Sequence, residues 1–148
     1  METDKLLRQL LDREQIRELI HRYCYAVDAR DLSVLGELFD DHCTLEIRHP
    51  GEQTQRCTGK SPILEFHRRN LNRDFTFLRH TTSNHIIDVK GDEASCKCYW
   101  NSALEFDGGA VSQSGRFMDR LRRVADAWKI TERVTLIEYV APFKHGWG

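Results

Sequence analysis

The sequence has no long run of apolar residues near its amino terminus. Residues 1–12 never contain more than two consecutive apolar side chains before a charge or a polar group. A secretory signal needs an apolar stretch of about 7–15 residues and a membrane-spanning helix about 20. We therefore expect a cytoplasmic protein without a membrane partner.

The sequence also lacks an excess of charge of one sign. Twenty-two lysines and arginines stand against 23 acidic residues, which gives a net charge of −1. General nucleic-acid binders carry a basic patch or stripe that neutralises phosphates. We therefore expect no nucleic-acid partner.

Several sequence motifs for common enzyme chemistry are missing. The chain has no glycine-rich phosphate loop, no Gly-x-Ser-x-Gly elbow and no His-Glu-x-x-His pair. Phosphoryl transfer, serine hydrolysis and zinc peptidase chemistry are therefore unsupported. We expect neither a cofactor nor a metal.

The cysteines do not form the framework of a disulfide-rich scaffold. They are five, an odd number, so reduced thiols are the expected state. Cys96 and Cys98 would point to the same face of a strand. Because no second cysteine pair with zinc spacing accompanies them, we interpret both as apolar core residues.

The composition is that of an ordinary soluble globular protein, with 40% hydrophobic and 30% charged residues in 148 positions. Domains usually span roughly 100–200 residues, and no repeat, low-complexity tract or linker divides the chain. A chain of this size buries about 68–70% of its unfolded surface, which is enough for a core and a ligand cavity. We expect a single domain over residues 1–148.

The first half of the chain has the period of helices. Apolar residues recur at helical steps through residues 12–27, after a capping-box pattern at Asp12 and Gln15. Asp31 is expected to cap a second short helix. Four leucines precede the first helix and add either a turn or a separate short helix: Leu6, Leu7, Leu10 and Leu11.

The second half changes to the period of strands. Residues 43–47 already form a strand candidate, and Ser61 and Pro62 then begin a third helix near residues 62–71. Four long alternating segments follow, separated by turn residues: 75–89, 94–106, 111–124 and 128–140. The pattern predicts an α+β fold, in which N-terminal helices wrap a curved antiparallel sheet into a cone. The mouth of this cone is the expected ligand pocket.

Asp28 and His80 are the polar residues with the clearest chemical potential. Asp28 ends the first helix, where a solvated carboxylate is the plain interpretation. His80 lies on a strand, where a single histidine is more often structural than catalytic. If a carboxylate reaches it, the pair has the parts of a general base. Strict alternation places His85 on the opposite face from His80 unless a bulge intervenes, which disfavours a metal site.

Arg133 is predicted to face solvent. In the alternating segment that follows Trp128, it shares parity with Lys129 and Thr131, whereas Ile130 and Val134 lie on the more apolar face. Alternation therefore favours a solvent-facing side chain. The alternative is that a charged residue near the cavity lines its polar wall.

The chain as a whole resembles the SnoaL-like branch of the nuclear-transport-factor-2-like cone fold. Within that superfamily it looks most like hexachlorocyclohexane dehydrochlorinase and bile acid 7α-dehydratase, with scytalone dehydratase more distant. The resemblance runs from about residue 13 to 143 and is carried by five segments: 13–28, 31–39, 80–84, 88–94 and 128–133. Scytalone dehydratase uses a second histidine on a following strand, and residues 94–106 contain none.

The resemblance implies a set of catalytic residues. Asp28 matches the family aspartate in its Ala-Val-Asp context, and His80 matches the histidine of a His-x-x-x-Asn pattern. Arg133 matches an arginine that completes the pocket, which overrides its predicted exposure, and Tyr23 matches a tyrosine of the bile acid enzyme. The further candidates for substrate binding are Tyr25, Asn84 and Trp100. The sequence leaves open whether Tyr23 or Tyr25 reaches the site.

The activity that the resemblance implies is a cofactor-independent, dehydratase-type elimination. His80 would remove a proton from a carbon of a small, apolar, cyclic or aromatic substrate, and Asp28 would orient His80. Arg133 and Tyr23 would stabilise or protonate the departing oxygen. Two alternatives remain: an isomerase that uses the same base, and a noncatalytic subunit like the small subunit of ring-hydroxylating dioxygenases. We also expect a homo-oligomer, either a dimer or a trimer.

Overall fold

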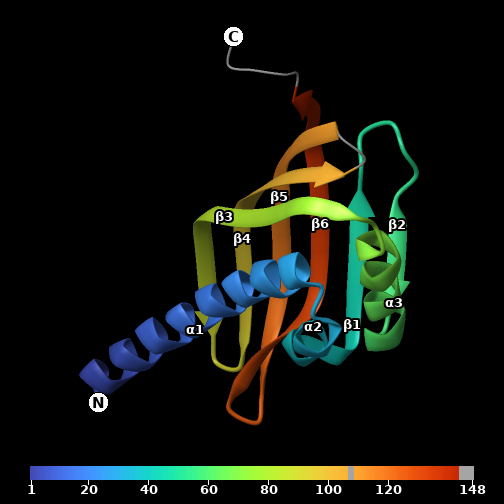
Figure 1. The fold of residues 1–148 in the computed structure, drawn as a ribbon. Helices are drawn as coiled ribbons and strands as arrows, with labels where there is room; N and C mark the ends of the chain where they lie inside the picture. Colours follow the sequence, from blue (N-terminus) through green and yellow to red (C-terminus); the bar gives the residue numbers. More distant parts are fainter. Residues whose placement is uncertain (107–108, 144–148) are drawn as a thin grey trace.

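The described residues form three helices and six strands in an α+β fold (Figure 1). The computed structural model describes residues 1–106 and 109–143. The elements are α1 (Glu2–Ala29), α2 (Leu32–Leu38), β1 (Phe39–Arg48), β2 (Gln55–Thr58), α3 (Lys60–Leu71), β3 (Phe75–Lys90), β4 (Glu93–Phe106), β5 (Gly109–Val124) and β6 (Ala127–Phe143). The expected turn at residues 107–109 lies largely outside the described residues.

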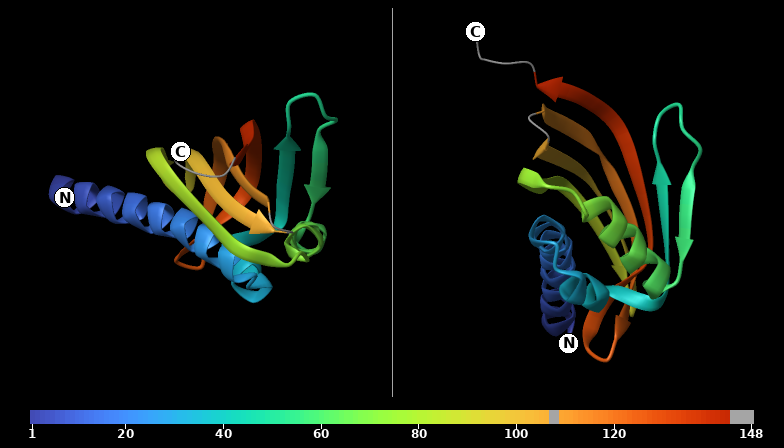
Figure 2. Two further views of the ribbon diagram at one scale, coloured as in Figure 1. Left: turned by 45° about the horizontal axis from the view of Figure 1, so that its top comes forward. Right: turned by 45° about the vertical axis from the view of Figure 1, so that its right-hand side comes forward.

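The six strands form one curved sheet in the order β2-β1-β6-β5-β4-β3. All neighbours are antiparallel except β1 and β6, which run parallel. The helices lie on one side of this sheet, and the sheet bends around them without closing (Figures 1 and 2). The predicted cone is confirmed. The short strand β2 and the parallel pairing of β1 with β6 were not predicted.

The boundaries of the helices differ from those expected. α1 is one continuous helix from Glu2, with Met1 rather than Asp12 at its N-cap position. Asp12 is buried and accepts hydrogen bonds from Arg123 and from the Trp128 indole, at 2.9 and 3.3 Å, so it fastens α1 to the end of the β5–β6 hairpin. The capping-box interpretation of Asp12 is therefore wrong.

The two shorter helices agree better with their sequence signals. The Asp31 carboxylate accepts a hydrogen bond from the Val34 amide at 3.1 Å, as predicted for the N-cap of α2. α3 begins at Lys60 after Gly59, slightly before the predicted Ser61–Pro62 start. The early start follows from the β2–α3 connection, where the Gly59 amide donates to the Cys43 carbonyl at 2.7 Å.

A bulge reverses the alternation of β3. The pairing of β3 with β4 shifts between Ser83 and Ile86, and Asn84 there adopts a φ of 58°. Asparagine tolerates this left-handed conformation better than most residues. Beyond the bulge Ile87 is buried and Ile86 is exposed, so His85 returns to the same side as His80. The predicted alternation is therefore wrong after Ser83.

A second bulge changes which face Arg133 occupies. Along β6, Ile130 pairs with Leu121 but Glu132 pairs with Arg120, which leaves Thr131 as an extra residue. Before the bulge, the even-numbered Ile130 faces inward; after it, the odd-numbered Arg133 and Thr135 do. Arg133 is 0% exposed, so its predicted solvent-facing position is wrong and the burial implied by the resemblance is right.

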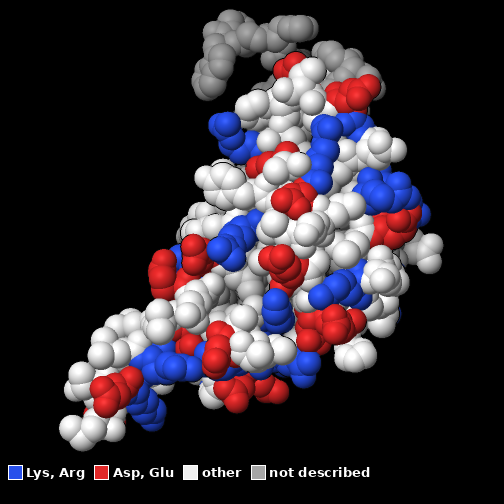
Figure 3. All heavy atoms as spheres, turned by 60° about the horizontal axis from the view of Figure 1, so that its bottom comes forward, with Lys and Arg blue, Asp and Glu red and all other residues white. Residues whose placement is uncertain are grey.

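The described surface carries mixed charge. On the face in Figure 3, basic and acidic side chains are interspersed without a large patch of either sign. None of the described helices is both long enough and apolar enough to cross a bilayer. All five cysteines are free, and Cys96 and Cys98 are buried on the same side of β4, as predicted.

Candidate active site

A cavity of about 550 Å³ lies inside the curve of the sheet, between the strands and the helices α1 and α3. The two helices and all six strands contribute to its wall, most of which is apolar; examples are Val27, Ile47, Phe66, Leu78, Trp100, Phe117 and Ile137. Its buried or half-buried polar residues include Tyr23, His67, His80 and Thr135. The volume is within the usual range of about 300–1,000 Å³ for small-molecule sites.

Asp28 and His80 meet at the wall of this cavity. Asp28 lies at the end of α1. Its carboxylate accepts hydrogen bonds from the His80 backbone amide at 2.9 Å and from His80 Nδ1 at 2.7 Å. Both side chains are about one-fifth exposed. A carboxylate can only accept, so Nδ1 carries the hydrogen and Nε2 is left as the basic nitrogen of the neutral ring. The contact offsets the unfavourable position of an acidic side chain at a helix C-terminus.

Tyr23 forms a second polar pair in the cavity, with a partner that the sequence analysis missed. The Tyr23 hydroxyl lies 2.9 Å from His67 Nε2, and His67 Nδ1 lies 2.9 Å from the Ile63 carbonyl oxygen. Burial lowers the pKa of His67 to about 4 and raises the pKa of Tyr23 above its ordinary value. A signal was available, because His67 shares its helix face with Ile63 and Leu71, an apolar stripe that faces the core.

Arg133 lies beneath the aromatic floor of the cavity. Its guanidinium donates to Asp119 at 2.7 and 2.8 Å and is enclosed by the rings of Tyr23 and Phe117, 4.1 and 4.0 Å away. Burial alone would lower the Arg133 pKa, but the Asp119 carboxylate raises it and keeps the group charged.

This placement corrects the expected role of Arg133. The side chain does not belong to the cavity lining, since Tyr23 and Phe117 cover it. In this arrangement Arg133 borders the cavity only through the rings of Tyr23 and Phe117. Arg133 Nη1 has no hydrogen-bond partner among the described residues, so the guanidinium is held by Asp119 and by the two aromatic rings.

The three further candidates for substrate binding lie in different places. Trp100 is buried in the cavity wall, 6.3 Å from the His80 ring centroid and stacked on Phe117. Tyr25 is 80% exposed and faces a separate hollow of about 270 Å³, which Asp28 and His80 also border. Asn84 is exposed at the β3 bulge and outside the cavity lining. Tyr23 is therefore the tyrosine that shares the cavity with His80.

Trp100 is held in place by a close approach of two strands. Its indole donates to the Leu136 carbonyl at 3.2 Å. A Cβ atom at Gly115 would lie 1.8 Å from that same oxygen, so only glycine fits between the two strands here. The glycine thus allows the contact that fixes one wall of the cavity.

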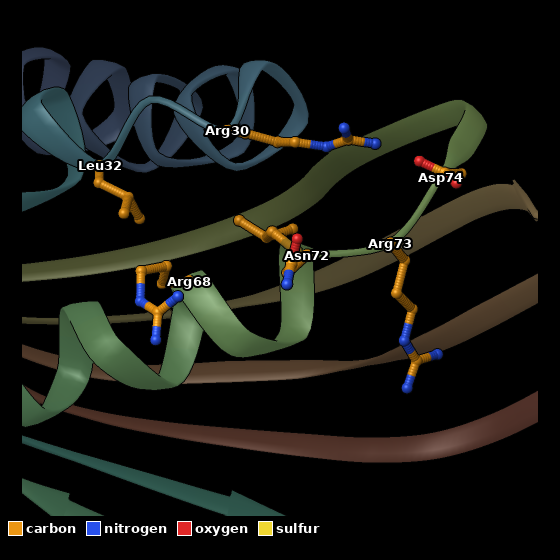
Figure 4. A pocket seen from close by; sticks show the side chains of 7 residues that line it. Arg30, Leu32, Arg68, Asn72, Arg73 and Asp74 are labelled. Atoms are coloured by element: carbon orange, nitrogen blue, oxygen red, sulfur yellow. The ribbon is translucent and has the colours of Figure 1, made fainter.

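Another hollow, between the α1–α2 junction, α3 and the loop that leads to β3, is rich in arginine. About 420 Å³ in volume, it is lined by Arg30, Arg68 and Arg73 together with other side chains. Figure 4 shows that these guanidinium groups do not converge on one point. Arg68 is bound to Glu65 at 2.8 and 2.5 Å, which already balances its charge. This arrangement does not favour an anion site.

The described residues, 1–106 and 109–143, contain no group of three or more His, Cys, Asp or Glu side chains arranged to hold a metal ion.

Comparisons with known proteins place this architecture in a family. A family model described as a SnoaL-like domain matches residues 8–134. A search of curated proteins found no match. Solved structures that share the fold have varied names and assigned activities.

Three of these structures are similar over nearly their whole length. A proposed aromatic ring hydroxylase from Novosphingobium aromaticivorans is 25% identical, with a TM-score of 0.79 over 90% of this chain and 94% of that one. A proposed scytalone dehydratase from the same organism is 20% identical, with a TM-score of 0.79 over 93% and 91%. A hexachlorocyclohexane dehydrochlorinase, LinA type 2, is 18% identical, with a TM-score of 0.79 over 93% of each chain. These similarities establish the fold. The reaction has to be inferred from the residues of the site.

Proposed function

The chain belongs to the SnoaL-like domain family, and from this premise we propose that it is a cofactor-independent lyase. Its substrate is a small, largely apolar, cyclic or aromatic molecule, and its reaction is an elimination of the dehydratase type. Dehydratase and dehydrochlorinase structures among the fold relatives support this reaction class.

The observation that carries the proposal is the contact between Asp28 and His80 at the wall of an apolar cavity. Asp28 accepts both the backbone amide and Nδ1 of His80, so the ring orientation and the tautomer are fixed together. A base must be both positioned and unprotonated at the nitrogen that faces the reaction. Because Nδ1 is directed at Asp28, Nε2 is the atom that we assign as the base.

In the proposed reaction, His80 Nε2 takes a proton from the carbon adjacent to the one that bears the leaving group. The electrons of the broken C–H bond form the new C=C bond, and the leaving group departs with the electrons of its own bond. Asp28 stabilises the imidazolium that forms, and His80 then returns the proton to the departing oxygen. A positioned base of this kind contributes about 10²–10⁴-fold to the rate.

The cavity walls and the buried Arg133 complete the proposal. Trp100 and Phe117 hold an apolar substrate out of water, which strengthens the electrostatic interactions of the His80–Asp28 pair. Arg133 acts as a positioning residue, because its guanidinium supports the Tyr23 and Phe117 rings from below. An open cavity bordered by His80 supports catalysis over the accessory-subunit alternative, for which a cone filled with side chains is expected.

The test is a mass-spectrometric screen of the purified protein against pooled hydroxylated aromatic, terpenoid and steroid compounds. His80→Ala and His80→Gln are screened in parallel, and the exposed His42 provides a matched control as His42→Ala. Loss of water from one compound, absent in both His80 variants and retained in the control, supports the lyase.

Repeating the reaction in deuterium oxide separates the outcomes. If a compound takes up deuterium but loses no atoms, and this exchange requires His80, the protein is an isomerase and not a lyase. If the wild type converts no compound and the His80 variants lose only thermal stability, the catalytic proposal is wrong.

A further inference from the structure

His67 and Tyr23 are tied together in the cavity by a hydrogen bond whose direction can be worked out. His67 Nδ1 lies 2.9 Å from the Ile63 carbonyl oxygen, which has no hydrogen to give. Nδ1 must therefore carry the hydrogen of this contact. The remaining ring nitrogen, Nε2, lies 2.9 Å from the Tyr23 hydroxyl.

The ring of His67 is neutral in its buried position. Only 5% of the residue is exposed, and burial lowers its pKa to about 4. A neutral imidazole with hydrogen on Nδ1 can only accept at Nε2. The Tyr23 hydroxyl therefore donates its single hydrogen to His67.

A tyrosine that has already given its hydrogen presents only lone pairs to other partners. The Arg133 guanidinium lies over the face of the Tyr23 ring and interacts with its hydroxyl. A hydroxyl oxygen has two lone pairs, so one remains for a ligand even beside this guanidinium. Tyr23 lines the cavity that His80 also borders. A ligand in this cavity therefore meets a hydrogen-bond acceptor at Tyr23 Oη.

We propose that His67 is a specificity-determining positioning residue, which turns Tyr23 into an acceptor and so selects neutral substrates that present a hydroxyl hydrogen to it. The chemical class is an alcohol or a phenol on a largely apolar ring system. Ethers and ketones of the same shape, which can only accept, leave the Tyr23 oxygen without a donor. This inference rests on the proposed function, because it takes the cavity as the substrate site.

The same direction of hydrogen bonding changes the role expected for Tyr23. Its hydrogen is committed to His67, so Tyr23 orients the substrate hydroxyl rather than protonating the departing oxygen. The proton for the leaving group then comes from His80. The two pairs thus have separate tasks: Asp28–His80 moves a proton, and Tyr23–His67 recognises the substrate.

The experiment compares two probes of nearly equal shape at neutral pH. 2-Naphthol has a hydroxyl hydrogen, whereas 2-methoxynaphthalene has only the oxygen. Their dissociation constants are measured by fluorescence for the wild type, Tyr23→Phe and His67→Phe. Tyr25→Phe is the matched control, because Tyr25 is an exposed tyrosine on the same helix.

The wild type should bind 2-naphthol about 3–10-fold more tightly than the methyl ether, the range expected for one net hydrogen bond. Tyr23→Phe should bring the ratio close to one, and Tyr25→Phe should leave it unchanged. His67→Phe frees the Tyr23 hydrogen, so the ether should gain affinity and the ratio should fall. A ratio near one in the wild type, an unchanged ratio in His67→Phe, or binding of neither probe overturns the proposal.

A second measurement keeps the proposal testable if His67→Phe does not fold. In wild-type protein labelled with ¹⁵N at histidine, the His67 ring should show protonated Nδ1 and unprotonated Nε2 at neutral pH. The opposite tautomer would overturn the proposal. Since His80→Ala should abolish turnover but keep the binding ratio, failure of the elimination and failure of this inference give different results.

Discussion

The Asp28 carboxylate accepts two hydrogen bonds from His80, one from the backbone amide at 2.9 Å and one from Nδ1 at 2.7 Å. The two residues are 52 positions apart in the sequence. The double contact couples the end of α1 to the middle of β3, the strand that α1 crosses (Figure 1). Since one of the two bonds comes from the His80 backbone, the packing of α1 on β3 fixes the position of Asp28 relative to His80.

Replacement of Asp28 by Asn should lower kcat by about 10²–10⁴-fold on the substrate found in the screen. The asparagine amide has nearly the same shape as the carboxylate, but it carries no negative charge and so cannot stabilise the imidazolium. Steady-state kinetics check this, with circular dichroism to confirm the fold. Asp88→Asn, an exposed carboxylate on the same strand as His80, should keep wild-type activity. Equal kcat values for Asp28→Asn and the wild type would remove the carboxylate from the mechanism.

Acidification should destabilise the protein through His67. Burial lowers the pKa of His67 from 6.5 to about 4, so the unfolded chain binds this proton more readily than the folded chain. Its contribution to stability is complete above pH 6.5 and is lost as the pH falls through about 4. At about 1.4 kcal/mol for each pH unit, the loss is about 3 kcal/mol.

Urea denaturation of the wild type and His67→Phe across this pH range checks the contribution. The difference in unfolding free energy between the two should change with pH, while His42→Phe, at an exposed position, should follow the wild type. Carboxylates such as Asp12 contribute equally in all three proteins and cancel in the comparison. Parallel curves for the wild type and His67→Phe would contradict a buried neutral His67.

Removal of one partner of the buried ion pair should be costly. Arg133→Met leaves the Asp119 carboxylate buried without its counter-charge, and both side chains are fully shielded from solvent. The expected loss is about 3–5 kcal/mol, whereas the double variant Arg133→Met/Asp119→Leu should recover most of it. Equilibrium unfolding of the two single variants and the double variant measures the coupling. Additive losses would show that the pair does not act as a unit.

Gly115→Ala should destabilise the protein by at least about 3 kcal/mol, because the new methyl group would clash with the backbone of β6. Its Cβ would lie 1.8 Å from the Leu136 carbonyl oxygen, where no flexible side chain can move aside. Gly36→Ala is the contrasting control. That glycine is inside α2 with its nearest neighbour at 3.4 Å, so alanine should stabilise the helix by about 0.5–1 kcal/mol. Thermal denaturation of both variants distinguishes the two sites.

The expected homo-oligomer can be tested on the outer face of the sheet. The exposed large apolar side chains on β3 to β6 include Ile86, Tyr99, Met118 and Tyr139. Burial of such residues against a second copy would remove apolar surface from water. Light scattering should therefore give a dimer or trimer mass, and Tyr99→Glu should reduce it. A monomer mass for the wild type at high concentration would refute the expectation.

Local sequence signals predicted the elements that depend on neighbours along the chain. The helical spacing of residues 12–27 predicted the second half of α1 but not its start at Glu2, and the Asp31 cap predicted α2. Caps and helix faces involve residues within a few positions. The four long alternating segments likewise predicted β3 to β6. The resemblance to SnoaL-like proteins then brought Asp28 and His80 together, which helical and strand periods alone left unresolved.

The sequence by itself determined the α+β class, the curved sheet and the two residues of the Asp28–His80 contact. Only the tertiary structure decided the bulge that turns Arg133 inward and the pairing of Tyr23 with His67. The physical reason is the same in both cases. A bulge is an extra residue defined by the register of the neighbouring strand, and a hydrogen bond between α1 and α3 depends on how both helices pack on the sheet. Neither relationship is encoded in a pattern of adjacent residues.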